Sequence, residues 1–148
     1  MRKTLNGKLA DSKAGFPGII SYHLDAMFEL QLDVPKNLAR LAYWNCVKPD
    51  EVKLCAQEFE ARLPELSPGF RLLTDLTGLE AMDVGCAPYI KAIMDSCNTR
   101  GISLVVRVIP DPRKDIGLNI MSLFHYRPDV RIMTFETLEE AVAELERS

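Results

Sequence analysis

The sequence contains no apolar run of about 18 residues, so it predicts no membrane-spanning helix. It also has no basic excess, since 18 lysines and arginines stand against 21 aspartates and glutamates, a formal net charge of -3. Non-specific nucleic-acid binding needs a clear positive excess. The basic start, Met1–Lys8, is not followed by an apolar segment, so no secretory signal is expected. These absences favour a soluble protein that does not bind nucleic acid and has no membrane span, and its free cysteines make the reducing cytoplasm the expected location.

Motifs for metals and cofactors are missing as well. The four cysteines form no CxxC pair, and the two histidines lie far from them in sequence: Cys46, Cys55, Cys86, Cys97, His23 and His125. This spacing gives no support to a zinc site. No glycine-rich phosphate motif is present, so no nucleotide or other cofactor is expected. Three of the cysteines fall on apolar faces of predicted elements, where free cysteine packs as a small hydrophobe.

The length of 148 residues matches one domain. Residues 1–25 mix Lys, Ser, Gly and Pro around one short apolar run, Ile19-Ile20. This composition predicts a flexible leader with an edge strand near its end. The patterned remainder, residues 26–148, is expected to be a single α/β domain.

Hydrophobic periodicity predicts the order of elements in that domain. Alternation in 27–33, a turn at Pro35-Lys36-Asn37 and a second strand over 38–47 indicate an antiparallel hairpin. Three strand–helix units follow a first helix that starts at Lys48-Pro49. Their strands are expected at 70–76, 102–109 and 130–134, with an irregular link after Thr77-Gly78.

Helix starts are marked by prolines and capping residues. Pro88 requires one helix to begin near Gly85 or Cys86, and Thr137 with Glu140 forms a capping box for the last helix. The resulting order predicts a mostly parallel mixed sheet with an antiparallel edge hairpin and about four helices.

A short motif adds a family resemblance to this pattern. The strand from Leu72 to Leu79, which reads Leu-Leu-Thr-Asp-Leu-Thr-Gly-Leu, is followed by Ala81-Met82-Asp83 and a helix. Together with the element order, it is similar to the STAS family, and in particular to its SpoIIAA-like group of bacterial cytoplasmic proteins. The resemblance extends over about residues 26–147. It implies a SpoIIAA-like fold and a regulatory role through a protein partner.

The resemblance also directs attention to one turn. The best-known members of that group are anti-sigma-factor antagonists, which are switched by phosphorylation of a serine in an Asp-Ser-Ser-Gly turn. The matching stretch here is Asp83-Val84-Gly85-Cys86, with Gly85 at the acceptor position. Because glycine has no hydroxyl, no phosphorylation switch is expected there. The turn, with Asp75 and Thr77 before it, is the candidate partner-binding surface.

Two other sites stay open at this stage. The loop from Pro110 to Asp115 follows a parallel strand and precedes a helix, where open α/β sheets often bind ligands. Arg113 and Lys114 could hold a small anion there, or the charges of this loop could pair locally with each other. Cys86 lies at a helix N-terminus, which favours a reactive thiolate; alternatively, it is a small residue that packs a tight turn.

No set of nucleophile, base and orienting residue is recognisable, so an enzyme is the weakest of the hypotheses. We therefore expect a non-enzymatic regulatory or protein-binding module with a STAS-like fold. The first alternative is a small-molecule or anion-binding protein that uses the loops near Asp83 and Arg113. The second is an enzyme or redox sensor that uses Cys86. A homodimer through the leader or the edge hairpin is also considered.

Overall fold

A computed structural model describes residues 19–21, 27–115 and 117–148. Within these residues, six strands form one sheet in the order β1-β2-β3-β4-β5-β6. Most of the predicted leader, residues 1–18 and 22–26, lies outside the described part, so its flexibility stays a prediction.

The strands follow the chain in sheet order: β1 (Ile19–Ser21), β2 (Phe28–Asp33), β3 (Leu38–Val47), β4 (Arg71–Met82), β5 (Leu104–Val108) and β6 (Arg131–Phe135). The α-helices of the described residues are α1 (Pro49–Arg62), α2 (Ala87–Arg100), α3 (Leu118–His125) and α4 (Leu138–Arg147). Three short 3₁₀ helices occupy Leu63–Glu65, Val84–Cys86 and Pro112–Lys114.

The pairing confirms the mixed sheet that the sequence predicts. β1 pairs antiparallel with β2, and β2 pairs antiparallel with β3 in the expected hairpin. From β3 onward every pair is parallel, and each crossover carries a helix. The short strand β1 adds to the outer side of the hairpin, where the sequence places an edge strand.

The length of β4 is the main difference from the sequence prediction. The irregular link expected after Thr77-Gly78 is instead strand, and β4 continues to Met82. It does so because β3 also runs on to Val47 and offers a partner, with Trp44 opposite Gly78 and Val47 opposite Met82. Two shifts of register between the strands absorb the irregular sequence.

The helix starts agree closely with the signals in the sequence. Pro49 opens α1, and the Lys48 N–H donates to the Glu51 carboxylate over 2.9 Å. The Thr137 hydroxyl accepts from the Glu140 N–H over 3.2 Å and caps α4. The helix expected to begin near Gly85 or Cys86 starts as a 3₁₀ turn at Val84 and becomes α2 at Ala87.

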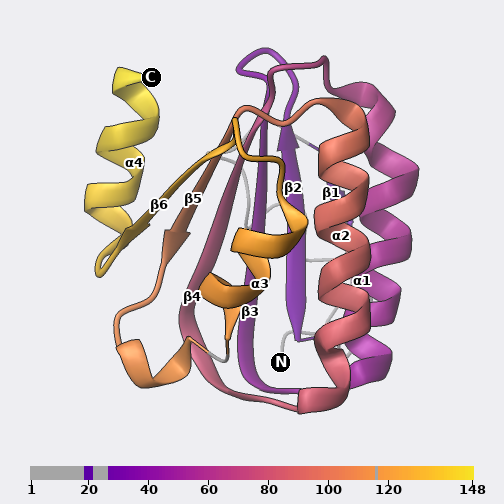
Figure 1. Ribbon diagram of the computed structural model, residues 1–148, viewed down its shortest axis with the longest axis vertical. Coiled ribbons are helices and arrows are strands. Elements are labelled where there is room, and N and C mark those ends of the chain that lie inside the picture. The colour runs from indigo at the N-terminus through magenta and orange to yellow at the C-terminus, as the bar shows by residue number, and fades with distance from the viewer. Residues whose placement is uncertain (1–18, 22–26, 116) are drawn as a thin grey trace.

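The two faces of the sheet carry separate cores. One is covered by α1, α2 and α3 and contains the largest buried side chains, among them Phe28, Phe59 and Phe70. The other lies under α4, where Ala141 and Leu145 share a core with Leu38, Leu73 and alternate residues of β5. Figure 1 shows α1 and α2 on one side of the strands and α4 on the other. Burial of the larger core contributes about 25 cal/mol for each Å² of apolar surface removed from water.

None of the helices in the described ranges is long and apolar enough to cross a membrane.

Candidate functional site

The Asp83–Cys86 turn is built where β3 and β4 end side by side. The Asp83 N–H donates to the Val47 carbonyl over 3.1 Å, which continues the parallel pairing by one step. The Asp83 carboxylate then accepts from the Gly85 N–H over 2.7 Å, and its carbonyl accepts from the Cys86 N–H over 2.9 Å. Side-chain capping of this kind satisfies the donors that a helix start leaves open. The turn is therefore fixed from both strands.

The residues of this turn point to opposite environments. Val84 is 88% exposed, although it is apolar, whereas Cys86 is 1% exposed and belongs to the core under α1 and α2. Asp83 and Gly85 are exposed, and so are Ala87 and Pro88 at the start of α2. The turn thus presents one apolar side chain to solvent from a rigid base.

The burial of Cys86 does not favour its interpretation as a reactive thiol. Its Sγ lies 3.8 Å from the Val47 carbonyl, inside the core. Desolvation raises the pKa of Cys86, and the nearby Asp83 carboxylate raises it further. The helix N-terminus does not compensate, because loss of water and a neighbouring negative charge both disfavour the thiolate. Cys86 is a packing residue of the turn.

Gly85 fits a place that a larger residue would crowd. A Cβ atom there would lie 3.1 Å from Cγ of Pro49 and 3.1 Å from Oδ1 of Asp83. The first residue of α1 thus presses against the turn that begins α2. The Cβ atom of a serine at this position would approach the same two atoms.

Asp75 and Thr77 lie elsewhere on β4. The Thr77 N–H donates to the Asp75 carboxylate over 3.0 Å, and the Thr77 hydroxyl donates to the same oxygen. The guanidinium of Arg40 is 3.9 Å from the other carboxylate oxygen. Seven residues of β4 lie between Asp75 and Asp83. The paired stretch of β3 runs only from Ala42 to Val47, so Asp75 and Thr77 lie roughly 10 to 20 Å along the sheet from the turn. The structure therefore does not bring these two residues to the turn.

The charged loop after β5 makes hydrogen bonds within itself. The Arg113 guanidinium donates to both carboxylate oxygens of Asp111, over 3.0 and 2.8 Å, so its charges pair locally. The same Asp111 carboxylate accepts from the Arg113 N–H over 3.0 Å and caps the short 3₁₀ helix. The side chain of Lys114 lies outside the described part. Local pairing is the alternative that the geometry favours for Arg113.

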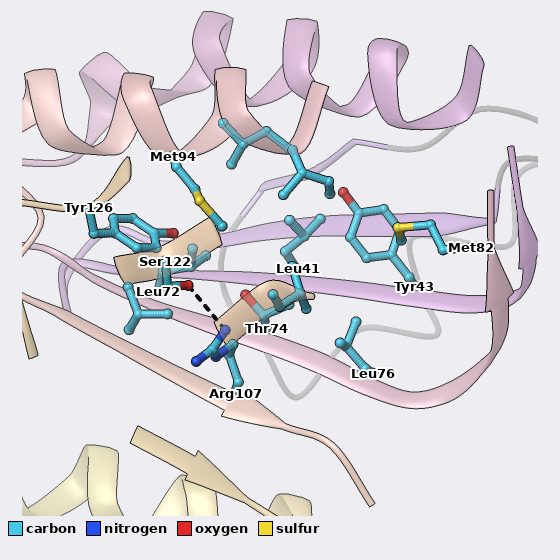
Figure 2. A pocket seen from close by; sticks show the side chains of 14 residues that line it. Leu41, Tyr43, Leu72, Thr74, Leu76, Met82, Met94, Arg107, Ser122 and Tyr126 are labelled. Atoms are coloured by element: carbon cyan, nitrogen blue, oxygen red, sulfur yellow. Dashed lines mark hydrogen bonds between the residues drawn. The ribbon is translucent and has the colours of Figure 1, made fainter. Parts of the chain in front are cut away.

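A cavity between the sheet and two helices was not expected from the sequence. Its walls come from β3, β4, β5, α2 and α3 and are mostly apolar, and its volume is about 40 Å³. The lining residues are Leu41, Tyr43, Leu72, Thr74, Leu76, Met82, Ile90, Ile93, Met94, Val105, Arg107, Leu118, Ser122 and Tyr126. Figure 2 shows these side chains.

Arg107 is the residue of this cavity that sequence reasoning missed. It is only 4% exposed, and its guanidinium donates to the Ser122 hydroxyl over 3.1 Å. Burial lowers the pKa of Arg107, while the Asp115 carboxylate favours its charged form. One feature of the sequence could have pointed to this residue: it is the one arginine in the otherwise apolar strand Leu104–Val108. Buried charge of this kind is expensive unless the site compensates it.

Comparisons with known proteins support the fold. No protein-family model and no curated protein matches the chain. Among solved structures, an uncharacterized protein of Shewanella loihica PV-4, described as a DUF3478 family protein with a SpoIIAA-like fold, is similar. It has a TM-score of 0.58 and 13% identity, covering 86% of this chain and 91% of that one.

The anti-sigma factor antagonist SpoIIAA, in its unphosphorylated form, is similar as well. Its TM-score is 0.55 at 15% identity, with 80% of this chain and 97% of that chain covered. The chain therefore has a SpoIIAA-like fold, as its resemblance to the STAS family predicts.

The contact between Gly85 and Pro49 can be tested by substitution. We expect Gly85→Ala and Gly85→Ser each to lower the free energy of unfolding by about 1 kcal/mol, because the added Cβ crowds a tight turn. Urea denaturation of both variants measures this loss. In a Pro49→Ala background the cost should fall, since the ring that the Cβ meets is absent. An equal cost in both backgrounds would contradict the contact.

The accessibility of the thiols provides a second test. In the native chain at about pH 8, we expect iodoacetamide to modify Cys46, which is exposed, well before Cys86. The reason is that only an accessible thiolate reacts, and burial raises the pKa of Cys86. Peptide mass spectrometry over time gives each rate, and Cys46→Ser serves as the control that lacks the fast site. Equal rates for the two thiols would show that Cys86 is reactive after all.

Proposed function

We propose that this chain is a non-enzymatic regulatory module that binds a protein partner through the Asp83–Cys86 turn and the start of α2. The partner offers a shallow apolar recess that receives the Val84 side chain. Ala87 and Pro88, both exposed, border the contact.

The exposure of Val84 is the observation that carries this proposal. Among the described residues, only Val34 and Val84 are large hydrophobic residues classed as exposed, and Val84 is 88% exposed against 44% for Val34. Transfer of an apolar side chain from water into a partner is favourable, by roughly 25 cal/mol per Å². An apolar side chain that a folded turn exposes to solvent is therefore suited to contact with a partner.

The rigidity of the turn supports the proposal from a second direction. Backbone pairing with Val47, capping by Asp83 and burial of Cys86 hold Val84 in one place. A preorganised contact residue loses little conformational freedom on binding, so more of its contact energy contributes to affinity. Flexible loops lack this advantage.

The fold adds a regulatory context. One solved structure with this fold is an anti-sigma factor antagonist, and the sequence resemblance to that family points to Asp83–Cys86 as the matching turn. If this match holds, Gly85 takes the place of the family's phosphorylated serine, and because glycine has no hydroxyl we propose that the binding is not switched by phosphorylation at that position. Four free cysteines accord with the reducing cytoplasm as the proposed location.

Site-specific photocrosslinking tests the docking surface. A benzophenone amino acid at position 84, introduced in cells of the source organism, should give a discrete crosslinked species. The matched control carries the same amino acid at position 34, the other exposed valine, in the β2–β3 turn at the opposite end of β3. The control should not give that species.

With the partner identified, Val84→Asp should weaken its binding about tenfold or more, because a charge would enter the apolar recess. Calorimetry with the purified pair measures this change. Absence of a crosslinked species from position 84, or the same species from position 34, would contradict the proposed surface.

A further inference from the structure

The sheet ends at β6, whose outer edge has no strand beside it among the described residues. Figure 1 shows β6 next to β5 at one margin of the sheet. The strand carries neither proline nor lysine, and its pairing with β5 has no shift of register. Proline, lysine and bulges are devices that keep an edge strand from pairing with another chain. The edge of β6 is therefore suited to pairing with a further strand.

The hydrogen bonds between β5 and β6 fix the direction of the backbone groups at both ends of β6. At its first residue, the Arg131 N–H donates to the Ser103 carbonyl over 3.2 Å. At its last residue, the Phe135 carbonyl accepts from the Ile109 N–H over 2.8 Å. The first and the last residue therefore direct these groups toward β5.

Between those ends, two residues face the other way. Successive residues of a strand direct their backbone groups to alternate sides, so Met133 shares the direction of Arg131 and Phe135. The N–H and C=O groups of Ile132 and Thr134 then point to the open edge, and Thr134 is exposed. These two residues offer two donors and two acceptors to a strand that lies alongside.

A second copy of β6 matches this set of donors and acceptors. In an antiparallel pair whose two-fold axis passes Met133, Ile132 lies opposite Thr134 of the second copy, and the reverse holds by symmetry. Residues that are opposite each other in this phase exchange both of their hydrogen bonds, so every outward group of the two strands has a partner. β-branched side chains also lie opposite each other in both pairs, which favours strand pairing.

The charges at the two ends of β6 are complementary in the same arrangement. Arg131 begins the strand, and the exposed Glu136 and Glu139 follow its end. Antiparallel pairing brings the basic end of each copy beside the acidic end of the other, and opposite charges favour such an encounter. Glu144 of the same chain lies 4.0 Å from Arg131, but 63% of the Arg131 side chain is exposed, so a second carboxylate can approach it.

We propose that two copies of this chain pair through their β6 edges, so that one sheet continues into the other around a two-fold axis. Each copy uses its one β6 edge, and the assembly therefore closes at two chains. A contact built on a strand of five residues belongs to the small and weak class of interfaces, so we expect a Kd of about 100 µM. β5 separates β6 from β4 and the turn at Val84, and the dimer does not depend on the proposed partner.

Disulfide trapping tests the contact and its register. The two copies of residue 133 form a non-hydrogen-bonded pair, with Cα atoms about 4.5 Å apart, a distance that a disulfide bridges. Met133→Cys, in the full chain with Cys46→Ser to remove the exposed thiol, should give a covalent dimer under mild oxidation. Thr134→Cys in the same background is the matched control. It should give at least about tenfold less, because its two copies are offset along the strands.

The control is demanding, since residue 134 is more exposed than residue 133 and random collisions would favour it. Equal or faster trapping through Thr134→Cys would therefore overturn the proposed register. Absence of a covalent dimer from Met133→Cys would overturn the contact itself.

Sedimentation equilibrium of the full chain measures the association without a crosslink. Between about 10 and 500 µM, the wild type should change reversibly from monomer to dimer. Thr134→Pro removes an outward N–H and no hydrogen bond to β5, so it should weaken the dimer about tenfold or more, whereas Thr134→Ser should associate as the wild type does. A wild type that stays monomeric at about 500 µM would leave this edge to a strand of another protein and overturn the proposal. A dimer that persists unchanged in Thr134→Pro would place the contact elsewhere and overturn it as well. The wild type and Thr134→Ser decide the question if Thr134→Pro does not fold.

Discussion

The parallel pairing of β3 and β4 continues beyond the ends of their neighbours, past β2 on one side and β5 on the other. Gly78 permits it, since a Cβ there would lie 3.0 Å from Cβ of Trp44. The extension brings Asp83 beside Val47, so the turn into α2 forms next to the start of α1. The contact of Gly85 with Pro49 follows from this neighbourhood, as does the burial of Cys86 between the two helices. The exposed position of Val84 depends on the same two strands.

Much of the fold could be predicted from the sequence because local signals and long-range pairing agree. Alternation in Phe28–Asp33 indicated a strand, and this strand forms half of a hairpin. Pro49 and Pro88 indicated helix starts, which tertiary contacts do not override. Where the two disagreed, the prediction failed. Thr77-Gly78 has the local composition of a turn, but β3 supplies a partner strand, and backbone hydrogen bonding outweighs a weak local preference.

The candidate site could be predicted only in part, since sequence shows positions and not surroundings. The motif places Asp83 and Gly85 in a turn, but burial of Cys86 and exposure of Val84 depend on how α1 packs beside them. The cavity could not be predicted from the sequence for a related reason. Arg107 stands out as a charge in an apolar strand, yet only the fold shows that it faces Ser122 on a helix fifteen positions later.

Hydrogen exchange at the Asp83 amide tests the central claim most directly, namely that the extended pairing of β3 and β4 holds the turn in place. This N–H donates to the Val47 carbonyl, the last hydrogen bond of the extension. NMR of the native chain should show it exchanging at least about a hundredfold more slowly than in an unstructured peptide. Exchange within a few-fold of the peptide rate would mean that the strands part before the turn, and it would contradict the account.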